Sequence, residues 1–259
     1  MGDSLMSNEN WMSVCQDQVH RLDRDRLMCA MVAPQDKRET LLVLLAFNLE
    51  IARIPELVSE PMLGEIRLQW WRETLEAVFS GKRVNHPVAL GLSAAIDKTG
   101  LSKSLFDEYL DARSFDLVGD APVSLLALEN YAASTAGALH ELMAESLGVA
   151  ALAPDQQQQV RRAVRHGGIA WALTGLLGAT AFHASQGRSY MPGDQEDGEK
   201  AVTVAAGRHI IEARSAHKNV PKSLLPVMLP VALADDNLCY GQGPARLFRF
   251  YWKVLTKRY

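Results

Sequence analysis

The side chains most suited to metal chemistry lie in two helix-prone apolar segments. Two carboxylates four residues apart on one helix share a face, so a pair can hold Mg²⁺, a hard ion that prefers oxygen ligands. In the first segment Ala52 precedes Glu56 by four residues, and in the second Ala179 precedes His183 by four. Alanine has no ligand atom, and an imidazole nitrogen suits zinc or iron better than Mg²⁺. Each segment therefore offers at most half of a ligand pair.

The remaining residue types form no other catalytic constellation. The seven histidines are scattered and show no zinc-binding spacing. The three cysteines lie far apart, form no C-x-x-C pair and are odd in number, which argues against a disulfide framework. We expect a reducing, intracellular compartment. The glycines near residues 167 and 175 lack the spacing of a nucleotide-binding loop.

Composition and charge describe an ordinary soluble globular protein. Hydrophobic residues make up 48% and charged residues 22% of 259, and the net charge of -3 gives no basic field for nucleic acid. No apolar run reaches the roughly 18 residues of a spanning helix. The polar, partly acidic N-terminus resembles neither a signal nor a transit peptide. We expect a cytoplasmic protein, complete as given, that can associate peripherally with the inner membrane.

Helical periodicity dominates, and no strand pattern of useful length occurs. Helices are predicted over residues 36–54, 61–80, 88–98, 102–117, 122–147, 154–182 and 201–216, with a short closing helix from Pro244. Pro61 suits a helix start, Gly81 and Gly100 suit helix ends, and Ser102 suits an N-cap. The fold expected is all-α with one core. Residues 1–22 should form a polar segment and first helix, and residues 23–259 a helical domain.

Three surface features are also predicted. Residues 185–200 and the pair Asp235–Asp236 should be solvated loops, because they are polar and, in the first case, rich in glycine and charge. The closing helix combines basic and aromatic residues, which suits a membrane interface or a protein partner, with a docked helix and solvated lysines as the alternative. Of Trp70 and Trp71, one should be buried and the other nearer the surface.

From residue 23 to residue 193 the chain resembles the squalene/phytoene synthase family. DRLMCAMVAPQDKRETLLVLLAFNLE is similar to the family's opening helices, with Arg38 where a basic residue belongs, although the usual Ser-Phe pair is replaced by Asp25–Arg26. YLDARSFDL, with Asp116, resembles its mid-chain helix, and ENYAASTAGAL matches its Tyr…Ala-Gly segment. Residues 172–192 fit its second motif without a gap.

This resemblance implies a single-domain isoprenoid-synthase-type bundle around a central cavity. In that frame the family's two D-x-x-x-D pairs, which hold Mg²⁺ against a prenyl diphosphate, fall on Ala52 with Glu56 and on Ala179 with His183. The residues that the resemblance places near a ligand are Arg38, Glu56, Asp116, His183, Arg188 and Tyr190.

With these replacements the chain resembles one branch of this superfamily. That branch comprises the mitochondrial complex I assembly factors with a phytoene-synthase-like domain and their bacterial relatives. IRLQWWRETLE, ALENYA and LGATAFHASQGRSYMP carry this resemblance. It implies a non-catalytic protein without a cofactor that contacts subunits or assembly intermediates of respiratory complex I and binds no nucleic acid. The retained cavity could hold an isoprenoid or quinone-like lipid.

Two alternatives stay open. The chain could be a prenyltransferase acting on farnesyl or geranylgeranyl diphosphate with Mg²⁺, which requires several side chains to converge on one cavity. Those side chains are Glu56, Asp116, His183 and Arg188. It could instead be a helical interaction module with a filled interior. Ala52 and Ala179 facing each other across an apolar gap, with no carboxylate near, would argue against the enzyme.

Overall fold

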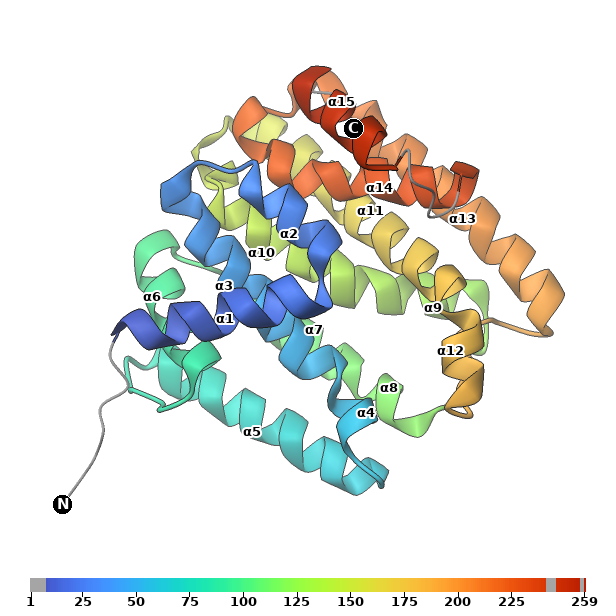
Figure 1. Ribbon diagram of the computed structural model, residues 1–259, viewed down its shortest axis with the longest axis horizontal. Helices are drawn as coiled ribbons and strands as arrows, with labels where there is room; N and C mark the ends of the chain where they lie inside the picture. The colour runs from blue at the N-terminus through green and yellow to red at the C-terminus, as the bar shows by residue number, and fades with distance from the viewer. Residues whose placement is uncertain (1–7, 241–245, 257–258) are drawn as a thin grey trace.

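The structure, a computed structural model, describes residues 8–240, 246–256 and 259, in which every regular element is a helix (Figure 1). The predicted all-α class is confirmed. Residues 1–7, part of the predicted N-terminal segment, lie outside the described residues. The α-helices are α1 Asn8–Leu22, α2 Arg24–Met31, α3 Gln35–Ala52, α4 Ile54–Leu57, α5 Pro61–Phe79, α6 Pro87–Thr99, α7 Lys103–Arg113, α8 Phe115–Val118, α9 Leu125–Ala132, α10 Ala138–Ser146, α11 Pro154–Gly178, α12 Thr180–Ser185, α13 Gln195–Ser215, α14 Leu225–Tyr240 and α15 Arg246–Thr256. A π-helical turn, η1 Ala133–Gly137, joins α9 to α10.

Helix α3 runs through the centre of the bundle and is buried on nearly all sides, as its apolar sequence predicted. Phe47 is fully buried, and its ring packs against those of Trp71, Phe106 and Tyr109 at centroid distances of 5.3–5.4 Å. Trp70, next to Trp71, is 41% exposed, so the two tryptophans divide between core and surface as expected. Helix α3 ends at Ala52, and Pro55 lies inside the short helix α4.

Proline and glycine mark the helix boundaries where the sequence placed them. Pro61 opens α5, and Gly81 and Gly100 follow α5 and α6 with φ of +75° and +65°, the left-handed region that glycine enters without steric cost. Ser102 occupies the N-cap position of α7, as predicted, but its side chain makes no capping hydrogen bond. Its hydroxyl and backbone N–H donate to the Glu145 carboxylate instead, at 2.8 and 2.9 Å.

Two predicted helix boundaries are wrong, because side-chain caps set the residues at which these helices begin. The helix expected from Pro122 begins at Leu125, where the Ser124 hydroxyl accepts the backbone N–H of Ala127 at 3.1 Å. The loop expected over 185–200 is shorter, since α13 starts at Gln195 behind the Asp194 carboxylate, which accepts a backbone N–H at 3.0 Å.

Helix α11 and the π-helical turn η1 touch at backbone level. A Cβ built on Gly168 would lie 2.5 Å from the carbonyl oxygen of Ala136 and 2.8 Å from the Cα of Gly137. No side chain fits in that space. The closeness lets α11 pack along η1 and α10, and it places residues of η1 beside the interior surface of α11.

The basic side chains of the closing helix α15 point toward α2 and α14. Arg246 pairs with Asp25 of α2 at 2.6 Å, and Arg249 with Asp236 of α14 at 3.0 Å. Asp235 and Asp236 therefore lie within α14 and not in the predicted solvated loop, and Asp236 is only 3% exposed. Lys253 also lies 3.7–3.9 Å from these two carboxylates, so it differs from the solvated lysines of the docked-helix alternative. Lys257 and Arg258, part of the predicted basic stretch, lie outside the described residues.

The outward face of α15 is apolar instead. Its exposed side chains are Leu247, Phe248, Tyr251, Trp252 and Leu255. Within the described ranges, no helix has the length and apolar character needed to cross a bilayer.

The backbone contact at Gly168 predicts a sharp difference between two glycines of one helix. Gly168→Ala should lower the free energy of unfolding by about 1–3 kcal/mol, because the added methyl group forces the α11 and η1 backbones apart. Gly175→Ala is the matched control, since a Cβ there meets nothing within 4 Å. It should raise stability by about 0.5–1 kcal/mol. Urea denaturation of both variants measures this, and equal midpoints would contradict it.

Candidate functional site

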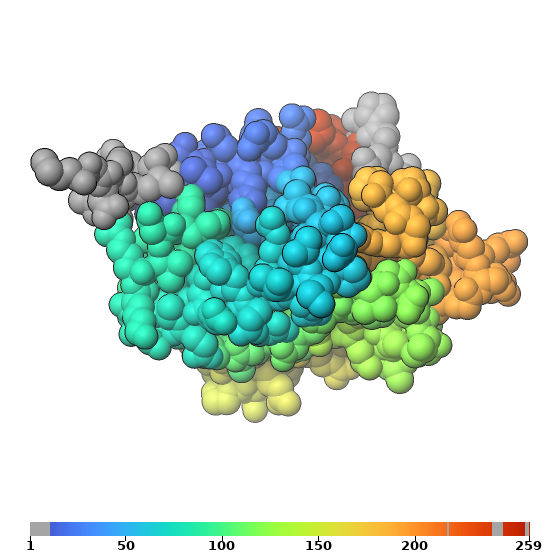
Figure 2. Space-filling model, turned by 90° about the horizontal axis from the view of Figure 1, so that it is seen from below, coloured from blue at the N-terminus to red at the C-terminus, as the bar shows by residue number. Residues whose placement is uncertain are grey.

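A central cavity of about 220 Å³ lies between α3, α11 and the elements around them. Its wall includes Asn48, Ala52, Arg113, Tyr131, Trp171 and His183. The segments that close its outer side come together on the face seen in Figure 2, where residues 50–60 lie next to residues 180–190. A filled interior, expected for a plain interaction module, is therefore not what this region of the chain shows.

The four motif positions divide between different surroundings. Ala52 and His183 line the central cavity together. The Glu56 side chain is 41% exposed and pairs with Arg53 at 3.2 Å. Ala179 borders a second depression, because α11 ends at Gly178 just before it. The two alanines thus do not face each other across one gap.

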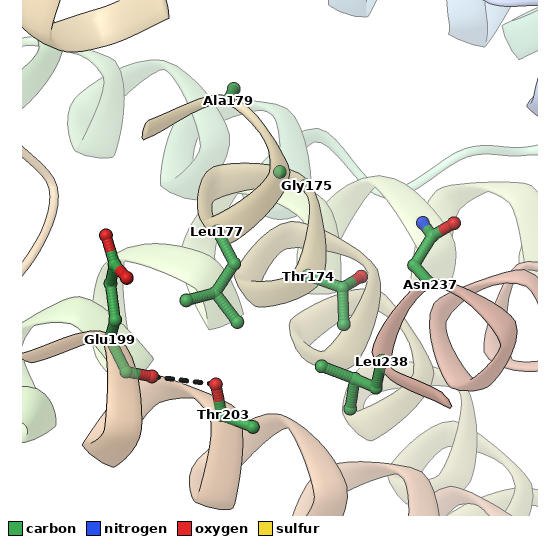
Figure 3. A pocket seen from close by; sticks show the side chains of 9 residues that line it. Thr174, Gly175, Leu177, Ala179, Glu199, Thr203, Asn237 and Leu238 are labelled. Carbon is green, nitrogen blue, oxygen red and sulfur yellow. Dashed lines mark hydrogen bonds between the residues drawn. The ribbon is translucent and has the colours of Figure 1, made fainter. Parts of the chain in front are cut away.

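That second depression, the side groove, has a volume of about 670 Å³ and lies between α11, α13 and α14. Figure 3 shows Thr174, Leu177 and Leu238 directed into it, with Ala179 at its edge. Gly175 lines both the side groove and the central cavity. The two spaces therefore meet at a residue without a side chain.

The donor set around the central cavity is a poor match for Mg²⁺. Ala52 offers no ligand atom, and burial lowers the pKa of His183, so its imidazole is neutral at pH 7. Neutral imidazole is a weak partner for a hard ion. Across the residues that the structure describes, no three His, Cys, Asp or Glu side chains are grouped so that they could hold a metal ion.

Asp116 is bonded to two residues of the cavity wall, and both of its oxygens accept hydrogen bonds. Tyr131 and Tyr190 donate their hydroxyls to Oδ1 at 2.6 and 2.8 Å, and Arg113 donates to Oδ2 at 2.9 Å. Burial raises the pKa of both tyrosines, so their hydroxyls stay protonated as donors. Asp116 is 3% exposed. This carboxylate joins α8, α9 and the segment after α12, and it presents no free oxygen pair to a metal.

Arg113 extends the same network toward α3. Its Nη2 donates to the Tyr109 hydroxyl at 2.9 Å and to Asn48 Oδ1 at 3.4 Å, and Tyr109 donates to that oxygen at 2.9 Å. Sequence reasoning did not single out Arg113, Tyr109 or Asn48. The spacing of Arg113 three residues before Asp116 was the available signal, because residues at i and i+3 on helical turns are neighbours.

Of the remaining predicted residues, Arg188 and Tyr190 line a small pocket together with His183, whereas Arg38 lies elsewhere. Arg188 donates to the carbonyl of Pro55 at 2.9 Å and so ties the segment after α12 to α4. The Tyr190 ring lies 4.8 Å from that of His183. Arg38 donates to the carbonyl of Ala33 at 2.7 Å in the first turn of α3. It lies roughly 20 Å along that helix from Ala52, so it is remote from the central cavity.

A histidine pair outside the cavity was also missed. His166 Nδ1 and His209 Nδ1 are 2.7 Å apart, and His209 Nε2 lies 2.8 Å from the Glu129 carboxylate. These contacts join α9, α11 and α13 across separations of 43 and 80 residues, which no local spacing reveals.

Comparison with known proteins gives a consistent relationship. The family described as squalene/phytoene synthase matches residues 19–205. The chain is 30% identical over 244 residues to "NADH dehydrogenase (ubiquinone) complex I, assembly factor 6" of Bos taurus, a match that covers 86% of this chain and 72% of that protein. The protein of the same name from Homo sapiens is 29% identical over the same coverage.

Two solved structures share the fold. A dehydrosqualene synthase in complex with a ligand is 14% identical, with a TM-score of 0.79 and 96% of each chain covered. Squalene synthase HpnC from Alicyclobacillus acidocaldarius is 16% identical, with a TM-score of 0.73 and coverage of 93% and 94%. At these identities the likeness establishes the fold alone. The expected isoprenoid-synthase-type bundle is confirmed.

Acid should destabilise the protein through His140, which is fully buried in α10 and donates Nδ1–H to the Ala136 carbonyl at 2.7 Å. Burial lowers the pKa of His140 to about 4, whereas an unfolded histidine titrates near 6.5. The unfolded state therefore binds more protons between these values. The free energy of unfolding should fall by about 3 kcal/mol from this residue as pH drops from about 6.5 to about 4.

Chemical denaturation at a series of pH values measures this fall. His140→Gln, which stays neutral, should show a shallower pH dependence. A residual slope should persist, because burial also lowers the pKa of His86, His166 and His183. Identical slopes in the wild-type protein and the variant would show that His140 is not the titrating group.

Proposed function

Since the chain belongs to the squalene/phytoene synthase family, we propose that it is a member without prenyl-transfer activity that acts as an assembly factor for respiratory complex I. The observation that carries the proposal is the make-up of the central cavity. Two of the four motif positions are alanines, and the buried carboxylate Asp116 is held by three hydrogen bonds. The relatives named as complex I assembly factor 6 support the assembly role.

Its partners on this proposal are subunits or assembly intermediates of that membrane complex. It would reach them from the cytoplasmic side as a peripheral protein, without Mg²⁺ or another cofactor. The central cavity and side groove would hold an isoprenoid or quinone-like lipid. The outward apolar face of α15 is a surface of the kind that contacts apolar partners.

The competing function is prenyl transfer with a rebuilt site. His183 is close enough to Asp116, Arg188 and Glu56 to interact electrostatically with each of them. This convergence is the one observation in favour of the enzyme. Asp116 already accepts three hydrogen bonds, and among the described residues no three His, Cys, Asp or Glu side chains are grouped to hold a metal ion, which favours the assembly role.

Deleting the gene in its host should lower the amount and activity of assembled complex I. Blue-native gels and NADH:quinone activity of membranes measure this, and the intact chain supplied in trans should restore both. Unchanged complex I together with altered isoprenoid content would contradict the proposal.

Glu56→Gln tests whether a carboxylate at the motif is needed. Because Glu56 is 41% exposed and its ion pair is at the surface, stability should change by less than about 1 kcal/mol. The variant should restore complex I in the deletion strain as well as the wild-type chain does. Loss of restoration with a normal protein level would favour the enzyme.

Purified protein should not consume prenyl diphosphates. Incubation with Mg²⁺ and farnesyl or geranylgeranyl diphosphate, followed by extraction and mass spectrometry, should yield no head-to-head product. An active squalene synthase assayed in parallel controls for the substrate. Clear product formation would overturn the non-catalytic assignment.

A further inference from the structure

The central cavity is close to electrically neutral although two guanidinium groups line it. Arg26 pairs with Asp23 at 2.6 Å and Arg113 with Asp116 at 2.9 Å, and all four side chains are at most 12% exposed. His183 adds a neutral imidazole at the cavity wall. Both guanidinium groups that line the cavity are thus matched by a carboxylate, so neither is a spare positive charge that would offset the desolvation of a bare diphosphate. The polar part of a ligand here is therefore uncharged.

The same wall has hydrogen-bond donors to offer. Asn48 is 5% exposed, and its Oδ1 accepts from both Tyr109 and Arg113, which fixes the amide with Nδ2 as the remaining group. Asn48 lines the cavity, so this remaining amide nitrogen can donate to a ligand there. A donor at a cavity wall gains a hydrogen bond when a ligand brings an acceptor to it. Among the described residues no carboxylate lines the cavity, and a carbonyl oxygen on a ligand would supply an acceptor for this amide.

Size and shape restrict that ligand further. A cavity of about 220 Å³ is smaller than the roughly 300–1,000 Å³ of pockets for drug-sized molecules, so it has room for one ring and not for a long chain. Trp171 supplies a flat aromatic wall against which a ring can stack. Gly175 opens this space to the side groove of about 670 Å³, where Leu177 and Leu238 give apolar surface (Figure 3).

We propose that the two spaces bind one uncharged lipid, with a carbonyl-bearing ring of the quinone type beside Asn48 and its hydrocarbon chain passing over Gly175 into the side groove. This rests on the proposed function, because it names the lipid class that a non-catalytic member of the family would hold. Asn48 donates to a ring carbonyl, and the neutral wall excludes the diphosphates that the scaffold's active relatives would need metal ions to hold.

Gly175→Leu tests the passage between the spaces without disturbing the fold. A Cβ on Gly175 meets nothing within 4 Å, so the new side chain occupies the ligand's path and not the protein's core. Gly207→Leu in α13 is the matched control, because its Cβ also meets nothing within 4 Å and it lines neither space. Melting temperatures of both variants confirm that they are folded.

Isothermal titration calorimetry with a short-chain ubiquinone provides the measurement, with farnesyl diphosphate titrated in parallel with and without Mg²⁺. The wild-type protein and Gly207→Leu should bind the quinone equally. Gly175→Leu should bind it about ten-fold or more weakly, a difference of about 1.4 kcal/mol. Asn48→Leu should also weaken binding, by about three- to ten-fold for one lost hydrogen bond.

Three results would overturn the proposal: no quinone binding, tighter binding of farnesyl diphosphate than of the quinone, or wild-type affinity in folded Gly175→Leu. The proposed function is judged separately, by restoration of complex I in the deletion strain. A chain that restores complex I but binds no quinone would retain the assembly role and lose the lipid. A chain that binds the quinone but does not restore complex I would retain the lipid site and lose the assembly role.

Discussion

The backbone contact between Gly168 and the π-helical turn η1 is the constraint on which the interior depends. Because no Cβ separates α11 from the Ala136 carbonyl, the two helical segments lie closer than side chains normally permit. The turn then presents Thr135 and Ala136 to the central cavity, while His140 caps the Ala136 carbonyl from the far side. A π-helical turn at this point fits the general association of such turns with functional sites. The shape of the cavity therefore follows from one glycine.

Charge within the bundle is arranged as closed pairs. Arg26 with Asp23 and Arg113 with Asp116 each neutralise one another inside the protein, and two tyrosines complete the Asp116 shell. Removing one member of such a pair leaves an uncompensated buried charge, so these groups hold the fold together more than they act on a substrate. The helical scaffold of the family thus contains, in this chain, buried charges that balance one another.

Sequence reasoning reached the features that depend on local rules. The ends of α5 and α6 and the burial of α3 follow from helix stop signals and apolar periodicity. It did not reach features fixed by distant partners. Asp116 bonds to Tyr190, 74 residues away, and Asp236 is buried by Arg249 of another helix. Ala179 does not line the central cavity with Ala52 and His183, because α11 ends one residue before it.

The ion pair between Arg246 and Asp25 joins residues 221 positions apart. Helix α2 also packs against α14, which is made about 200 residues later. Until α14 and α15 have been made, the Asp25 carboxylate and the side of α2 that meets α14 lack the groups that cover them in the folded protein, although α1 and α3 already pack against α2. A chain shortened by these two helices would therefore leave one side of α2 exposed.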